Sequence, residues 1–156
     1  MGARVIVADA NIVAYFFIQG PKTGLARSVR ERDPHWIVPD IWRHEFVNIL
    51  VSACLFAKLP TAEANRIWRD AEGMVQGGVH VGEMATILSL AVDRSVTAYD
   101  AAYVALAVER GVRCVTEDEA LRKAFPGMAV SMSTFLEGGT TVGGVVRERR
   151  ARYRTR

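Results

Sequence analysis

The sequence predicts an α/β domain with a mostly parallel β-sheet. Short apolar runs, the first of them RVIVA at residues 4–8, alternate with longer segments whose apolar residues recur at helical spacing. The first run is largely β-branched and suits a buried strand. Ligands of such sheets bind beyond the carboxyl ends of the strands, so residues that directly follow a strand are the first candidates for chemistry.

These patterns define expected strands and helices along the whole chain. Strands are expected at residues 4–8, 35–38, 79–81, 112–115 and 129–131, and helices at residues 12–17, 23–32, 41–56, 61–76, 84–91, 98–110 and 118–124. The clearest helix is 61–76, which is amphipathic and ends at Gly77-Gly78. Asp40 is the expected N-cap of helix 41–56, and Gly111 is expected to end helix 98–110.

The composition indicates an ordinary globular domain. Half of the 156 residues are hydrophobic and 24% are charged. No apolar run reaches the roughly 18 residues that suggest a membrane span. The first ten residues are too short an apolar stretch, and too acidic, for a secretory signal, so we expect a cytoplasmic protein with no membrane partner. Cys54 and Cys114 lie in apolar segments and are expected to be free thiols, with no zinc site.

Positive charge is concentrated at the C-terminus. The formal net charge is +3, but residues 147–156 alone hold six Arg and one Glu. That segment carries +5, which leaves the rest of the chain at −2. Glycine pairs at Gly138-Gly139 and Gly143-Gly144 precede it. We therefore expect a globular domain at residues 1–137 and a basic, Arg-rich tail at residues 138–156.

Four acidic residues are candidates for a site. Asp9 directly follows the first strand, Asp118 follows the fourth, and Asp100 begins a helix. Glu45 lies near the start of an apolar helix, where a carboxylate is rarely left without a partner.

Each acid also has a local explanation. Asp9 can cap the next helix, and Thr97 with Asp100 is close to a capping box. Thr116 and Glu119 can form a capping box of their own, which leaves Asp118 free to point elsewhere. The local role of Asp118 would be favourable charge in the first turn of the helix. Glu45 can lie at the surface.

Three of these acids share a place as well as a charge. Asp9, Asp100 and Asp118 are expected near the carboxyl edge of one sheet, where clustered carboxylates repel by roughly 4 kcal/mol per pair at ~4 Å and an effective dielectric of about 20. Such a group needs a cation, and all-oxygen ligands suit Mg²⁺ or Mn²⁺ better than zinc. These ions bind phosphate oxygens and make hydroxide available for attack.

Four segments come in a characteristic order and spacing: residues 5–15 (VIVADANIVAY), 39–48 (PDIWRHEFVN), 95–107 (SVTAYDAAYVALA) and 114–121 (CVTEDEAL). Together they resemble the PIN-domain family, and most of all its VapC-like branch of ribonuclease toxins from bacterial toxin–antitoxin pairs. The most specific stretch is TAYDAAYVALA, and the resemblance covers roughly residues 4–137.

The resemblance implies a function, a fold and partners. The family's metal ligands fall on Asp9, Glu45, Asp100 and Asp118, and Asn11 and Thr116 become candidates for positioning the substrate or the ligands. It implies a three-layer fold with a five-stranded parallel sheet in the order 3-2-1-4-5 and helices on both faces. It also implies an Mg²⁺- or Mn²⁺-dependent ribonuclease, a homodimer, and inhibition by a small antitoxin.

Two other functions remain open from the residues alone. One is a catalytically idle module that binds RNA or a partner, aided by its basic tail. The other is a phosphotransfer domain with acids at strand ends. That second alternative is disfavoured because the first motif, Asp9-Ala10-Asn11, has no second Asp, and because no well-placed Lys follows a late strand.

Overall fold

Five parallel strands form the centre of the computed structural model, which describes residues 4–138 of the chain. The strands are β1 (Val5–Ala8), β2 (His35–Pro39), β3 (Val79–His80), β4 (Cys114–Val115) and β5 (Ala129–Val130). Their order in the sheet is β3-β2-β1-β4-β5, and every neighbouring pair is parallel. This confirms the expected order 3-2-1-4-5.

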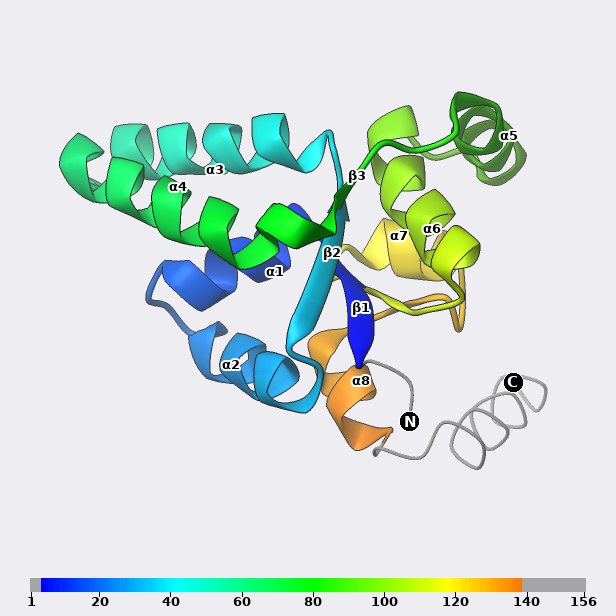
Figure 1. The fold of residues 1–156 in the computed structure, drawn as a ribbon, viewed down its shortest axis with the longest axis horizontal. Coiled ribbons are helices and arrows are strands. Elements are labelled where there is room, and N and C mark those ends of the chain that lie inside the picture. The colour runs from blue at the N-terminus through cyan, green and yellow to red at the C-terminus, as the bar shows by residue number, and fades with distance from the viewer. Residues whose placement is uncertain (1–3, 139–156) are drawn as a thin grey trace.

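Helices cover both faces of the sheet. They are α1 (Ala10–Phe17), α2 (Thr23–Arg32), α3 (Trp42–Phe56), α4 (Thr61–Val75), α5 (Met84–Arg94), α6 (Ala98–Arg110), α7 (Glu119–Ala124) and α8 (Met132–Glu137), with a short 3₁₀ helix, η1 (Gln76–Gly78). Figure 1 shows α1 to α4 on one side of the sheet and α5, α6 and α7 on the other. The three-layer α/β fold expected from the sequence is therefore confirmed.

Burial explains why β1 and α6 position the site. Ile6, Val7 and Ala8 of β1 are fully buried because strands lie on both sides of it and helices on both faces. Along α6, every residue from 101 to 107 is buried, and four of these seven are alanines. Small side chains let a helix lie close to its neighbours, and α6 contacts β1, β2 and β4. The start of α6, with Asp100, is thereby fixed near the carboxyl ends of these strands.

Two glycines are required by the backbone. A Cβ on Gly78, at the end of η1, would lie 2.7 Å from the carbonyl oxygen of Trp36 in β2, so only glycine fits there. Gly111 ends α6 with a φ of 64°, the left-handed conformation that glycine adopts without strain. Both observations agree with the expected helix ends.

Several details differ from the sequence predictions. The strands after β2 are each only two residues long. Asp40 is not a side-chain N-cap: α3 begins at Trp42 after Ile41, and only the backbone oxygen of Asp40 accepts a hydrogen bond, from Arg43. Helix α8 was not expected at all. The hydroxyl of Ser131 caps it by accepting from the backbone N–H of Thr134, and Met132 and Phe135 bury its inner face.

Other expectations concern the cysteines, the membrane and the tail. Cys54 and Cys114 are both free thiols, although only Cys114 is fully buried. None of the helices within residues 4–138 is both long and apolar enough to cross a membrane. Apart from Gly138, the expected tail at residues 138–156 lies outside the described residues, so the division into domain and tail stays a prediction.

Candidate active site

Asp9 is positioned by the end of β1 and by a hydroxyl from the end of β4. It follows Ala8 directly, and its backbone N–H donates to the carbonyl of Val115 in β4. Its carboxylate makes no capping hydrogen bond to α1; instead it accepts a 2.6 Å hydrogen bond from the hydroxyl of Thr116. The local capping explanation of Asp9 is therefore wrong, and the carboxylate is turned toward the end of β4.

Thr116 joins two of the candidate acids. It is fully buried, and while its hydroxyl donates to Asp9 it also accepts the backbone N–H of Asp118 at 3.1 Å. Thr116 could have formed a capping box with Glu119, but Glu119 pairs with Lys123 instead. The N-cap of α7 is Asp118 itself, which accepts the N–H of Leu121 at 3.0 Å with one carboxylate oxygen.

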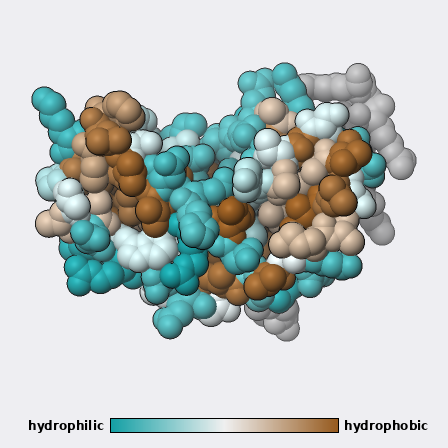
Figure 2. Space-filling model, turned by 90° about the horizontal axis from the view of Figure 1, so that it is seen from above, coloured by the Kyte–Doolittle hydropathy of each residue, from teal (hydrophilic) through white to brown (hydrophobic). Residues whose placement is uncertain are grey.

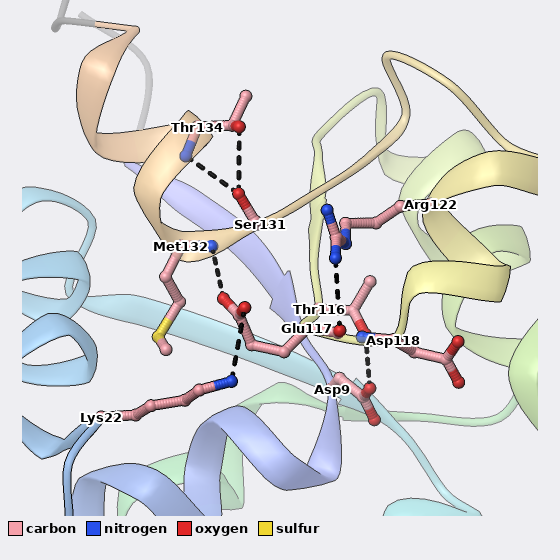
Figure 3. A network of polar contacts seen from close by, with 9 residues as sticks. All are labelled: Asp9, Lys22, Thr116, Glu117, Asp118, Arg122, Ser131, Met132 and Thr134. Atoms are coloured by element: carbon pink, nitrogen blue, oxygen red, sulfur yellow. Dashed lines mark hydrogen bonds and ion pairs between the residues drawn. The ribbon is translucent and has the colours of Figure 1, made fainter.

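Glu117 points away from this group. Figure 3 shows its side chain directed toward Lys22 and Met132, with Asp118 pointing the opposite way. One oxygen of Glu117 accepts the N–H of Met132 at 2.9 Å, and the other lies 3.6 Å from the ammonium group of Lys22. Glu117 is therefore turned away from Asp9, whereas Asp118 is linked to Asp9 through the hydroxyl of Thr116.

Glu45 is held by a residue that the sequence analysis missed. The phenol of Tyr103, on α6, donates a 2.6 Å hydrogen bond to the Glu45 carboxylate on α3. Tyr103 is almost fully buried, and its pKa is raised well above the usual value by burial and by the negative charges of Glu45 and Asp9. A signal was present: Tyr103 follows Asp100 by three residues, which places both on one face of a helix.

Asp100 lies half-buried at the start of α6. The hydroxyl of Thr97 caps the helix by accepting the backbone N–H of Asp100, as the sequence indicates. Burial and the charge of Asp118 raise the pKa of the Asp100 carboxyl, and the hydrogen bond with Thr97 lowers it. The N-cap hydrogen bond is made to the backbone N–H of Asp100. Its carboxylate therefore still interacts with the charge of Asp118.

The acids affect one another through their charges. Burial raises the pKa of Asp9 to about 6, the Thr116 hydrogen bond opposes this rise, and the charges of Glu45 and Asp100 add to it. The pKa of Glu45 is raised first by burial and also by the charge of Asp100, against the effect of the Tyr103 hydrogen bond. We call Asp9, Glu45, Asp100 and Asp118 the acidic corner.

The acidic corner has the right donors for a hard cation but is not closed around one. Carboxylate oxygens are the ligands that Mg²⁺ and Mn²⁺ prefer. The charges of neighbouring acids add to the effect of burial in raising the pKa of Asp9 and of Asp100, so a positive charge would be favourable there. Within residues 4–138, no three carboxylates, imidazoles or thiols are close enough together to hold a metal ion as they stand. Asn11 lies exposed in the first turn of α1, two residues after Asp9.

Comparison with known proteins agrees with this geometry. The PIN-domain profile matches residues 6–125, which cover β1 through α7 and all four acids of the corner. The chain belongs to the PIN-domain family. The family expected from the four sequence motifs is therefore confirmed, and PIN domains are generally metal-dependent nucleases.

Two solved structures show the same fold. The PIN domain described here is similar to the crystal structure of PAE2754 from Pyrobaculum aerophilum, with a TM-score of 0.69 and 22% identity over 86% of this chain and 88% of that one. It is also similar to FitAcB from Neisseria gonorrhoeae, with a TM-score of 0.58 and 17% identity over 81% of this chain and 96% of that one. No curated protein matches the sequence.

Proposed function

We propose that this PIN domain is an endoribonuclease that uses Mg²⁺ or Mn²⁺ to hydrolyse RNA phosphodiester bonds at the acidic corner. The observation that supports this most is the environment of Asp9. Its carboxylate is fixed by Thr116 between the ends of β1 and β4, and its pKa is raised first by burial and then by the charges of Glu45 and Asp100. Ionised acids in such a group gain stability from a bound cation.

Each residue of the corner has a role in this proposal. Asp9, Asp100 and Asp118 supply the main oxygen ligands, and Asp118 keeps one carboxylate oxygen that does not cap α7. Glu45, oriented by Tyr103, binds the ion directly or through water, or orients the attacking water. A bound ion would offset the negative charge of the phosphate and activate water at neutral pH.

Thr116 and Asn11 complete the set. Thr116 contacts both Asp9 and the backbone of Asp118, so it positions the ligands and does not itself react. Asn11 is exposed beside Asp9 and can contact the substrate.

The proposal extends to the biological role of the chain. The VapC-like motifs support a toxin of a type II toxin–antitoxin pair, acting in the cytoplasm as a homodimer and inhibited by a small antitoxin protein. The alternative is a catalytically idle PIN domain that binds RNA or a partner, because the acids within residues 4–138 are not closed around an ion. A small antitoxin-like reading frame beside the gene would favour the first.

Cleavage by the purified chain separates these alternatives. We expect a single-stranded RNA to be cut with Mg²⁺ or Mn²⁺ and to stay intact in EDTA. Asp9→Asn and Asp100→Asn should each lower turnover by roughly 100-fold or more while the fold survives. Asp70→Asn is the matched control, since Asp70 is exposed on α4 outside the corner. Near-normal cleavage by either corner variant would contradict the proposed site.

A further inference from the structure

A cleft of about 410 Å³ opens beside the acidic corner, between the start of α3, α5 and the start of α6. Its size falls within the roughly 300–1,000 Å³ that is usual for small-molecule sites. Ile41, Ile87 and Ala102 line it, and of these Ile87 and Ala102 are buried. The cleft therefore has an apolar base that belongs to the packed core.

Two large side chains in the walls of the cleft are unusually exposed for an aromatic and an apolar residue. Tyr99 is 60% exposed and Met84 is 65% exposed, and both line the cleft. The polar groups of Asp40, Arg43 and His44 lie on the α3 side. An apolar base, an aromatic ring and polar groups along one edge fit a flat heterocycle that has a hydrogen-bonding edge of its own.

The cleft adjoins the acidic corner along the chain at two points. Tyr99 directly precedes Asp100 on α6, and His44 directly precedes Glu45 on α3. Figure 2 shows hydrophobic side chains gathered over α3 and α4 on one side and over α5 on the other, with a hydrophilic band and a smaller hydrophobic patch between them. A group bound in the cleft is thus next to the place where the scissile phosphate is proposed to bind.

The charge of the domain favours a subsite of this kind for an RNA substrate. The acidic corner repels phosphates, and the described domain has no large positive excess to offset this, since the chain outside residues 147–156 carries −2. Stacking of a base on an aromatic ring contributes affinity without positive charge. It requires a base that is free to leave its neighbours, as in single-stranded RNA.

We propose that this cleft binds one nucleobase of single-stranded RNA next to the cleaved linkage, with Tyr99 as its stacking surface and Met84 opposite. The proposal depends on the ribonuclease function proposed above and adds to it the recognition of a base. Tyr99 would act on substrate affinity and leave the chemical step to the acids.

Substitutions in both the protein and the RNA test the contact between Tyr99 and the nucleobase directly. The probe is a short labelled single-stranded RNA of mixed sequence, in which an abasic nucleotide replaces each position in turn. Binding is measured by fluorescence anisotropy in EDTA, and KM and kcat are measured with Mg²⁺. For the wild-type chain we expect one abasic position to raise Kd and KM by roughly tenfold, with kcat little changed.

Variants then assign that effect to Tyr99. Tyr99→Ala should raise Kd for the intact RNA by a similar factor, and the abasic position should then have no further effect. Tyr99→Phe should bind like the wild type because it keeps the ring. Leu88→Ala is the matched control: Leu88 is an exposed apolar residue of α5 that does not line the cleft. Met84→Ala is a second variant should Tyr99→Ala fold poorly.

The possible results distinguish a failure of the base subsite from a failure of the ribonuclease function. Independent, additive effects of the abasic position and of Tyr99→Ala would overturn the base subsite. A change of oligomeric state in Tyr99→Ala with unaltered RNA affinity would also overturn it, and would show that the cleft is an interface between two copies of the chain. Metal-dependent cleavage without any position-specific base effect would overturn the subsite and leave the ribonuclease function standing. Base-specific binding in EDTA without cleavage would support the cleft and remove the proposed catalytic function.

Discussion

Among the carboxylates of the acidic corner, Asp9 is the one whose ionisation the fold opposes most. Its pKa in the folded chain is about 6, against an ordinary value of 3.8, chiefly because it is buried. A raised carboxyl pKa means that the folded state binds more protons than the unfolded chain between about pH 4 and pH 6. The free energy of unfolding must therefore fall as pH rises through this window and stay lowered above it.

Asp9→Asn should remove this penalty. In EDTA we expect the variant to be more stable than the wild type at pH 8, on the order of 2 to 3 kcal/mol, and no more stable below pH 4. The Asn side chain can still accept the Thr116 hydrogen bond. Denaturant melts across pH 4 to 8 measure the difference, with Asp70→Asn as the control that should show none of this pH dependence. A stability change that is the same at every pH would contradict the raised pKa.

The turn between β4 and α7 is an element with two functions. On one side, the hydroxyl of Thr116 donates to Asp9 and accepts the backbone N–H of Asp118. On the other side, Glu117 ties the turn to the first N–H of α8 and to Lys22, just before α2 (Figure 3). The position of two site residues therefore depends on a contact made by the residue between them.

We expect Glu117→Ala to destabilise the fold by roughly 1 to 3 kcal/mol. The substitution leaves the part-buried N–H of Met132 without its acceptor, and removing the partner of such a group costs about this much. Glu119→Ala is the matched control, because its ion pair with Lys123 is exposed and such pairs contribute little. Urea melts of the two variants measure the difference. Equal destabilisation by the two substitutions would show that the Glu117 contacts contribute no more to stability than an exposed ion pair does.

Most elements of the fold could be predicted because their patterns are local. The β-branched run of β1, the amphipathic face of α4 and the glycine after α6 each determine their own element. Short strands such as β4 and β5 have ill-defined ends, because only two residues in each complete the ladder. Helix α8 was missed although Ser131 is a good N-cap, since its six residues give few positions at which a helical period can be detected.

The candidate site was only half predictable for a different reason. Asp9, Glu45, Asp100 and Asp118 are visible in the sequence because each has a defined place after a strand or in a first helical turn. Their partners are not, since the Tyr103–Glu45 contact spans 58 residues and the Thr116–Asp9 contact spans 107. Local rules offered capping roles for Asp9 and Thr116 that the tertiary contacts replace.

At the scale of the whole molecule, metal binding should be visible as stability. The folded chain gathers the acids of the corner and the unfolded chain does not, so a bound ion stabilises the fold by mass action. At a metal concentration about 100 times the Kd, the gain is about 2.7 kcal/mol, or roughly 5 to 10 °C in Tm for a domain of this size. Thermal melts with Mg²⁺ or Mn²⁺ should show this rise in the wild type and in Asp70→Asn, and should show none in Asp118→Ala. A wild-type Tm that does not change with millimolar metal would contradict metal binding at the acidic corner.

The distribution of charge along the chain predicts separate roles for the domain and the tail in RNA binding. The acidic corner repels the phosphates that it is proposed to cleave, whereas residues 147–156 carry six Arg. Arg side chains that bind phosphates give affinity without sequence choice, and each phosphate of a single strand bound in this way adds roughly 0.7 to the slope of log affinity against log salt. We therefore propose that the tail increases RNA affinity and leaves the chemistry to the domain.

Truncation after Glu137 tests this separation of roles. RNA binding should weaken most at low salt, the salt slope should become shallower by roughly 0.7 for each phosphate that the tail neutralises, and turnover of bound RNA should stay near normal. A variant with Arg149→Lys, Arg150→Lys and Arg152→Lys should keep the wild-type slope, because it keeps the charge. An unchanged slope on truncation would contradict the proposal. Dissociation of a dimer on truncation, measured by light scattering, would instead show that the tail docks on a partner subunit, since removing solvated charge alone has no reason to separate two chains.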